Sequence, residues 1–227
     1  YIMPYTNAIE KAAEGGHMNI ILLLTPKFGY CSYEWILKGA AKGGHMDIVL
    51  FALENKASNF NNGLVGAAKG GHMDIAQLML EKGSADFISA DFNYALACAA
   101  RSGHMNIVEL MVEKGADNFD HGMEEAAAKG HMDIIHLMLE KGATDYDSAL
   151  WSAPLSHDVN IVQLFLDKGA KEYNRGLTTA VCCGCKDIVK LFLEKGATNL
   201  NNAVSIAKTY GHPKICKLIQ RRIDDSS

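Results

Sequence analysis

The stretch Ala67-Ala68-Lys69-Gly70-Gly71-His72-Met73-Asp74-Ile75 decides the fold of this 227-residue chain, because close copies of it recur at regular intervals. Gly-His-Met returns five times with spacings of 28, 27, 32 and 27 residues, and further steps of 27 reach three more positions. We call these eight positions the marks and number repeats 1 to 8 by them: His17, His45, His72, His104, His131, Asp158, Cys185 and His212. A fixed period of this size predicts a solenoid, in which each unit buries its apolar side against its neighbours.

Each unit reads as two helices around a turn. In repeat 3, Leu64, Ala67 and Ala68 share one face of a first helix that Gly71 ends. A second helix follows the mark, with Asp or Asn in its first turn and Lys in its last, which suits the helix dipole. A glycine such as Gly83 then stands where a left-handed C-cap is favoured. We therefore predict an all-α helix-turn-helix unit with no room for a strand.

A short polar residue stands eleven positions before nearly every mark. Its side-chain oxygen is of the kind that accepts from the open N–H groups of a first turn, so we expect it to cap the first helix. The series is Thr6, Asn61, Asn93, Asp120, Asp147, Asn174 and Asn201, with Glu34 as the exception in repeat 2.

The eight units predict a single solenoid over residues 1–222, with a polar last repeat and a frayed tail over 223–227. The spacing of 32 comes from five extra residues within 85–92, where we expect a longer loop. Pro154 falls inside the first helix of repeat 6, where a proline removes a hydrogen bond. That repeat is either a hinge or a copy that has drifted.

Composition excludes several classes of protein. The formal net charge of −4 argues against a nucleic-acid-binding surface of the basic type. No apolar run approaches the 18 or more residues of a membrane span. The six cysteines do not recur with the repeat, which favours reduced thiols and an intracellular location over a disulfide framework.

Neither a metal site nor a catalytic site is expected. Histidines one repeat apart would lie about 8–10 Å from each other, too far to share one zinc ion. Cys182, Cys183 and Cys185 could hold a soft metal, but no fourth ligand is near them in the sequence. Catalytic and nucleotide-binding motifs are absent. We expect a non-enzymatic protein with no cofactor and no small-molecule substrate.

The chain resembles the ankyrin-repeat family over roughly residues 4–222. The resemblance rests on 67–75, on Ala-Lys-Gly-His-Met-Asp-Ile-Ile at 128–135 and on Ile-Val-Gln-Leu-Phe-Leu-Asp-Lys-Gly-Ala at 161–170. It implies that the mark histidine orders the turn between the helices, and that a partner protein binds the concave face of the first helices. The amino-acid sequence of the repeats is similar to that of the ankyrin arrays of large DNA viruses. This similarity would place the protein in host cytoplasm or in a virion.

One departure from the family concerns the linkers. The ankyrin period is about 33 residues, whereas the usual step here is 27. The missing residues fall where the family places a β-hairpin. We therefore predict an ankyrin-like solenoid with truncated hairpins.

Positions that vary between repeats mark the expected binding face. On the first helix these lie ten, six and three residues before the mark. The candidates are Trp35, Lys42, Lys69, Tyr94, Arg101, Glu125 and Arg175. Repeats 2 to 4 contribute a basic strip with two aromatics, and interface hot spots are enriched in Trp, Tyr and Arg. An acidic segment of another protein is the partner that this strip would suit.

Two other functions remain open at this point. The solenoid could be a structural component of a larger assembly such as a virion, with a permanent partner. Alternatively, aromatic side chains beside basic ones suit base stacking with single-stranded nucleic acid, although the net negative charge disfavours it.

Overall fold

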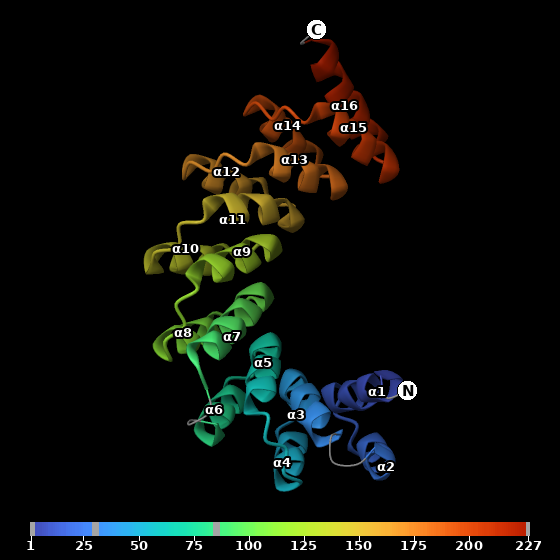
Figure 1. Cartoon of the computed structure of the whole chain (residues 1–227), viewed down its shortest axis with the longest axis vertical. Coiled ribbons are helices and arrows are strands. Elements are labelled where there is room, and N and C mark those ends of the chain that lie inside the picture. Colours follow the sequence, from blue (N-terminus) through green and yellow to red (C-terminus); the bar gives the residue numbers. More distant parts are fainter. Residues whose placement is uncertain (1–2, 29–31, 84–86, 226–227) are drawn as a thin grey trace. The chain divides into compact units, whose positions relative to one another are not determined.

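The computed structural model describes residues 3–28, 32–83 and 87–225. Within these ranges the regular elements are helices and there is no strand (Figure 1). The predicted all-α class is confirmed. In the described linkers, such as 142–145 and 195–199, only four or five residues separate one repeat from the next.

The described helices form eight pairs, and each mark directly precedes the second helix of its pair. The first helices are α1 (Met3–Glu14), α3 (Ser32–Gly43), α5 (Phe60–Gly70), α7 (Ser89–Ser102), α9 (Phe119–Lys129), α11 (Tyr146–Ser152), α13 (Tyr173–Cys182) and α15 (Leu200–Thr209). The second helices are α2 (Met18–Phe28), α4 (Met46–Glu54), α6 (Met73–Lys82), α8 (Met105–Glu113), α10 (Met132–Lys141), α12 (Val159–Asp167), α14 (Lys186–Glu194) and α16 (Pro213–Asp224).

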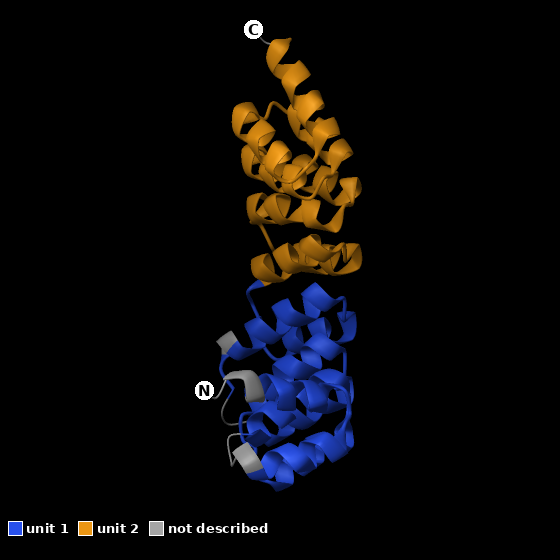
Figure 2. Ribbon diagram, turned by 90° about the vertical axis from the view of Figure 1, so that its right-hand side faces the viewer, with its two compact units in different colours: residues 1–118 blue, residues 119–227 orange. Residues whose placement is uncertain are grey.

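The pairs group into two compact units, residues 1–118 and 119–227 (Figure 2). In unit 1 the first helices α1, α3, α5 and α7 pack in chain order, and each carries its second helix on one side. In unit 2 the helices α9, α11, α13 and α15 repeat this arrangement. The continuity of all eight repeats into one solenoid over 1–222 stays a prediction.

The core of each unit is built from equivalent positions in most repeats. The isoleucine three residues after the mark is buried in every repeat except repeat 1, where Ile20 is 41% exposed, and the alanines of the first helix are buried beside it, as in Ile75, Ala67 and Ala68. Repeats 6 and 7 add the largest buried side chains, Phe165 and Phe192. The helical periodicity of apolar residues therefore predicts the buried face correctly.

The glycine before the mark has two separate structural roles. Gly71 has φ of +82°, the left-handed conformation that ends the first helix. A Cβ atom at Gly71 would also lie 2.6 Å from the ring of His104, the mark of the next repeat. Gly16 and the His45 ring stand in the same relation, again at 2.6 Å. The histidine ring of one repeat thus packs against the glycine that precedes the mark of the previous repeat, where a side chain would leave no room for the ring.

The mark histidine also bonds across repeats. His45 Nε2 donates to the Glu14 carbonyl at 3.1 Å, and His104 Nε2 donates to the Lys69 carbonyl at 3.3 Å. In unit 2, His212 Nε2 donates to a carbonyl at the end of α13 at 3.2 Å. These carbonyls belong to the last turn of a helix, where no intrahelical donor remains. In these three repeats the histidine therefore ties its repeat to the preceding one, in addition to standing at its own turn.

The predicted N-caps are wrong, because the polar residue eleven before the mark lies inside the helix, as its second residue in repeats 3 and 5 to 8 and deeper in repeats 1, 2 and 4. Its oxygen instead accepts backbone N–H groups of the linker 24 and 25 residues later. Asp120 Oδ1 accepts from Thr144 at 2.6 Å and from Asp145 at 2.8 Å. The same pair of bonds is made by Asn93, Asp147 and Asn174. We call this arrangement the linker clamp.

Glu34 belongs to the linker clamp as well, although its sequence marked it as the exception. Its two oxygens accept separately from the N–H groups of Ser58 and Asn59, both at 2.9 Å. In repeats 3 and 6 a side-chain cap stands two residues earlier than predicted. Asn59 Oδ1 accepts from the Asn62 N–H, and Asp145 Oδ1 accepts from the Ser148 N–H, each at 3.0 Å.

The extra residues of repeat 4 do not all form a loop. The helix α7 has 14 residues, against 11 in α5 and α9. It begins three residues before Phe92, whereas α5 and α9 begin on the equivalent residues Phe60 and Phe119. Asp91 closes its first turn by accepting from the Ile88 N–H at 3.0 Å. Residues 84–86, where the rest of the predicted loop falls, lie outside the described residues.

Pro154 ends the α-helical part of the first helix in repeat 6. The helix α11 has seven residues and is followed by a 3₁₀ turn, η1 (Ala153–Ser156), in which Pro154 is buried. His157 then takes the left-handed conformation that glycine has in most other repeats, with φ of +60°. The hinge interpretation of this repeat stays a prediction.

The predicted frayed tail over 223–227 stays a prediction. The helix α16 continues through Ile223 to Asp224, and Ile223 is half-buried. Arg221 and Arg222 lie in its last turn, where positive charge suits the helix dipole. The last two residues of the chain lie outside the described residues.

Candidate protein-binding face

The exposed side of the first helices differs by one position from the predicted one. Residues six before the mark are buried in several repeats, namely Gly39, Gly66, Cys98 and Ser152. A Cβ atom at Gly66 would lie 2.6 Å from the Lys38 carbonyl of the neighbouring first helix. Each inner first helix has a neighbour on both sides, so this position faces a helix and not solvent. Position ten before the mark is half-exposed or exposed in every repeat, whereas position seven is open in some repeats, as at Lys38 and Trp151, and buried in others, as at Val65 and Ala97.

The candidates of unit 1 lie on three adjacent first helices, α3, α5 and α7. Tyr94 has 52% of its surface exposed, and the Lys69 ammonium lies 5.8 Å from its ring centroid. The Lys38 ammonium lies 5.2 Å from the Trp35 ring. Both pairs are within the range of cation–π attraction. Lys42 is half-buried and Arg101 exposed at the ends of their helices.

The Trp35 end of this strip is less basic than predicted. Glu14 lies 2.7 Å from the Lys42 ammonium and 2.7 Å from the Lys11 ammonium. Glu10 lies 3.0 Å from the Lys38 ammonium. Hydrogen bonds from Lys11 and Lys42 hold the pKa of Glu14 below its usual value. Lys69, by contrast, has no carboxylate partner within the described ranges.

In unit 2 the structure adds a residue that the sequence analysis missed. The Arg175 guanidinium lies 4.2 Å from the ring centroid of Trp151, which has 40% of its surface exposed. Trp151 stands seven before its mark, the position that the predicted helical face left out. Glu125 is half-buried on α9, with a carboxylate oxygen 3.6 Å from His121 Nε2. The two predicted candidates, Glu125 on α9 and Arg175 on α13, belong to different first helices that are separated by α11.

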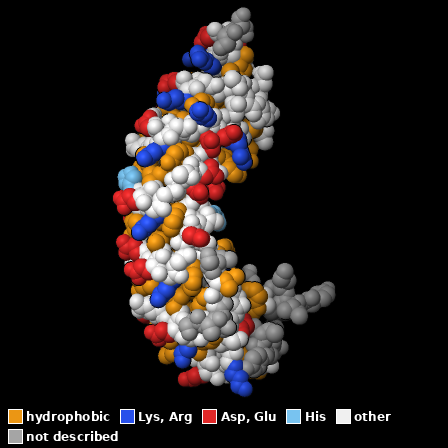
Figure 3. Space-filling model, turned by 60° about the vertical axis from the view of Figure 1, so that its left-hand side comes forward, with side chains coloured by type: hydrophobic (Ala, Val, Ile, Leu, Met, Phe, Trp, Pro, Cys, Tyr) orange, Lys and Arg blue, Asp and Glu red, His pale blue; other side chains and the backbone are white. Residues whose placement is uncertain are grey.

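Charge of both signs is spread along the surface. Figure 3 shows lysine or arginine side chains and acidic side chains interspersed on the face in view, with hydrophobic side chains between them. Such a mixed surface offers no extended field of one sign for a nucleic-acid backbone. On the face shown, recognition would depend on individual side chains.

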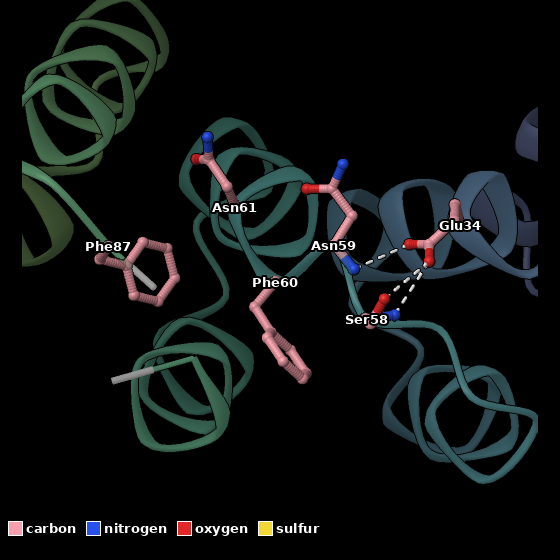
Figure 4. A pocket seen from close by; sticks show the side chains of 6 residues that line it. All are labelled: Glu34, Ser58, Asn59, Phe60, Asn61 and Phe87. Atoms are coloured by element: carbon pink, nitrogen blue, oxygen red, sulfur yellow. Dashed lines mark hydrogen bonds between the residues drawn. The ribbon is translucent and has the colours of Figure 1, made fainter. Parts of the chain in front are cut away.

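A cavity of about 460 Å³ opens beside the clamp of repeat 2 (Figure 4). It is lined by Glu34, Ser58, Asn59, Phe60, Asn61 and Phe87. The Glu34 carboxylate is already used by two backbone N–H groups. The Asn61 side-chain oxygen is buried and has no hydrogen-bond partner in the described structure. The lining of the cavity holds no acid–base pair for catalysis.

Cys185 replaces the mark histidine of repeat 7 and meets His157 of the previous repeat. Its Sγ lies 3.0 Å from His157 Nδ1 and 3.5 Å from the Pro154 carbonyl. Burial, with a smaller contribution from Cys183, raises the pKa of the Cys185 thiol to about 11. The thiol stays protonated at neutral pH and is therefore a poor nucleophile and a poor metal ligand.

We expect this raised pKa to appear in the pH dependence of stability. An unfolded cysteine ionises near pH 8.5, so between about pH 9 and 11 the unfolded state loses its proton first and the stabilising effect is lost as pH rises. Chemical denaturation across this range measures it. The wild-type protein loses stability more steeply than Cys185→Ser. Equal slopes for the two proteins would show that the buried thiol is not responsible.

Neither a metal centre nor a membrane span is found in the described residues. No three His, Cys, Asp or Glu side chains among them lie close enough together to hold a metal ion. None of the described helices has the length and apolar character needed to cross a membrane.

A comparison with known protein families finds a match for part of the repeat array. Residues 37–121 match a family model for ankyrin repeats, in three copies. No curated protein matches the chain. The matched residues span α3 to α9, and the same helix pair with its mark recurs before and after them. Ankyrin repeats generally mediate protein–protein interactions. Residues 37–121 are therefore ankyrin repeats, within a chain whose helix-pair fold is of the ankyrin-like all-α type.

Proposed function

We propose that this protein is a non-enzymatic binding module for another protein, and that in unit 1 the partner docks on the Tyr94 strip. We define this strip as Lys69, Tyr94 and Arg101. The observation that carries the proposal is the half-exposed Tyr94 ring beneath the Lys69 ammonium. All three residues lie within the matched ankyrin repeats.

The physical properties of the strip suit an interface anchor. Tyr94 stands on α7, whose inner positions from Ala95 to Ala100 are buried, so the ring is presented on a fixed backbone. Tyrosine and arginine are enriched among the residues that contribute most to binding energy. Lys69 has no carboxylate partner among the described residues. An acidic segment of the partner would supply one.

We place the protein in an intracellular compartment. Five cysteines in the described residues are free thiols, which supports a reducing environment of this kind.

The binding site could extend beyond the Tyr94 strip. Trp35 and Lys42 extend the strip towards α3, but their neighbouring lysines and glutamates are already paired. We therefore assign them a smaller share of the binding energy.

The test is a comparison of two variants in capture and affinity measurements. Proteins captured from an intracellular lysate by the wild-type chain are identified, and the Kd of a specific partner is measured with Lys69→Ala/Tyr94→Ala. We expect binding to weaken by about 30-fold or more, as for a hot spot of at least 2 kcal/mol. Tyr210→Ala is the matched control, because that ring is 59% exposed in unit 2, and it should leave the Kd unchanged.

Other outcomes would contradict the proposal at different levels. A partner that binds both variants equally would refute the Tyr94 strip but keep the module. A constitutive, stoichiometric partner that never dissociates would favour the structural alternative, as in a virion component. Affinity for an oligonucleotide that falls steeply with salt would favour nucleic-acid binding.

A further inference from the structure

The second helix of repeat 8 reverses the charge found at two positions of the other repeats. Lys214 stands two residues after its mark, where the other seven repeats have only Asp or Asn. Arg221 stands nine residues after the mark, where six of the other repeats have Glu or Asp and the first has Pro26. Aspartate and glutamate are as polar as lysine and arginine, so the need for a polar surface does not explain the reversal.

The reversal at Lys214 is unfavourable for the helix that carries it. Lys214 is the second residue of α16, whose first turn holds no acidic residue. A positive charge there opposes the helix dipole, which favours Asp or Glu in the first turn. Helix formation therefore gives no reason for a lysine at this position, whereas binding of an anionic group would supply one.

Lys214 and Arg221 lie on one side of α16 together with Lys217. The spacing of three and then four residues places the three side chains in a narrow row along the helix, and all three are exposed. None of them has a carboxylate partner among the described residues. We call these three residues the α16 stripe.

The exposure of the α16 stripe does not depend on its place in the last repeat. Repeat 5 is followed by another repeat, and the equivalent residues of its second helix are nevertheless exposed: Asp133, His136 and Glu140. A further repeat after α16 would therefore leave the stripe open.

Basic residues of α14 border the α16 stripe. Lys186 and Lys214 line one hollow of about 270 Å³, and Lys190 and Arg221 line another of about 320 Å³. Lys190 is paired with Asp187 at 3.0 Å. Residues 186–222 contain eight Lys or Arg and two Asp or Glu, whereas residues 1–185 contain 14 and 22. Positive charge is thus concentrated on the last helices of a chain that is otherwise acidic.

The lining of the second hollow favours a protein segment over a polyanion. Besides Lys190 and Arg221, two leucines and two carboxylates line it: Leu193, Leu218, Glu194 and Asp225. The carboxylates would repel a continuous run of phosphates, as in a nucleic acid or an anionic membrane. The leucines suit an apolar side chain. An acidic peptide with an apolar residue between its carboxylates matches both features.

We propose that the α16 stripe, with Lys186 beside it, binds an acidic segment of another protein in which an apolar residue separates the carboxylates. The carboxylates pair with Lys214 and Arg221, and the apolar side chain enters the hollow between α14 and α16. This site lies on second helices of unit 2, whereas the Tyr94 strip lies on first helices of unit 1. The two sites are therefore independent proposals.

A variant that gives repeat 8 the charges of the other repeats tests this proposal. Lys214→Asp/Arg221→Glu introduces the residue types that repeat 7 has in Asp187 and Glu194. The denaturant midpoint should stay the same or rise, because Asp suits the first turn of α16. The probe is a fluorescein-labelled peptide of glutamates with a leucine at every third position. We expect its Kd to be about tenfold or more higher for the variant, because two attractive charges become repulsive.

Two other variants serve as controls. Lys141→Asp/Lys168→Glu changes the net charge of unit 2 by the same amount at exposed lysines away from the stripe, and it should alter the Kd by less than about twofold. Lys69→Ala/Tyr94→Ala reports on the Tyr94 strip alone, so failure of one proposal can be told from failure of the other.

Several results would overturn the proposal. They are equal peptide affinity for the wild-type protein and Lys214→Asp/Arg221→Glu, loss of binding only in Lys69→Ala/Tyr94→Ala, and no measurable binding to the wild-type protein. Tighter binding of single-stranded DNA or of phosphatidylserine vesicles that depends on Lys214 and Arg221 would assign the stripe to a nucleic acid or a membrane, and would also overturn it.

Discussion

Gly71→Ala is expected to lower the free energy of unfolding by about 2–5 kcal/mol, the largest effect that we predict for a single added methyl group. Two costs add. A residue with a Cβ atom costs about 1–2 kcal/mol in the left-handed conformation that Gly71 adopts, with φ of +82°. The new atom would also lie 2.6 Å from the His104 ring, and overpacking of this kind costs about 1–3 kcal/mol. Chemical denaturation measures the sum.

Gly115→Ala separates the two costs. Gly115 also has positive φ, at +99°, but a Cβ atom there would meet nothing within 4 Å. Only the backbone cost of about 1–2 kcal/mol is expected. If Gly71→Ala destabilised no more than Gly115→Ala, then the stacking of the histidine ring on the glycine would contribute nothing, and our account of the Gly-His motif would be wrong.

Asp120→Ala is the second large effect, with an expected loss of about 1.5–3 kcal/mol. The Asp120 carboxylate accepts two N–H groups of the linker, from Thr144 and Asp145. Hydrogen bonds to a charged acceptor contribute about 1.5–3 kcal/mol, and the exposure of this linker keeps the total within the range of one such bond. Thermal or chemical unfolding of the whole chain measures the loss.

Two matched variants test the linker clamp. Asp120→Asn should retain most of the stability, because asparagine makes the same two bonds in Asn93 and Asn174. Asp187→Ala removes an acidic side chain that is 81% exposed and paired only with Lys190, so its loss should stay below about 1 kcal/mol. Equal effects of Asp120→Ala and Asp187→Ala would mean that the clamp has no structural role.

The helix pairs could be predicted from the sequence because they depend on local signals. The spacing of apolar residues, the glycine before the mark and the lysine at the end of the second helix each act within one repeat. The linker clamp could not be predicted in the same way. A polar residue near a helix start can bond to its own helix or to a linker 24 residues later, and only the stacking of repeats decides between them.

The candidate face was predicted in part, for a related reason. Positions seven and six before the mark are adjacent on the helix, and burial by the neighbouring first helices decides whether either of them is open. In repeat 6 position seven is open, whereas in repeats 3 and 4 both positions are buried. Gly39 and Gly66 are buried there, whereas Trp151 stands at the open position and contacts Arg175. A small residue at a supposedly exposed position was the signal, since glycine in a helix interior is otherwise unfavourable.

The linker clamp has a consequence for how such a chain can change over evolutionary time. Its bonds span 24 or 25 residues, so they connect a repeat only to the linker that follows it. Stability in such arrays is approximately a sum of repeat and nearest-neighbour contributions. Duplication or deletion of a whole repeat would therefore rebuild every bond with an equivalent partner. The gene can lengthen or shorten in steps of one repeat without new mutations at the junction.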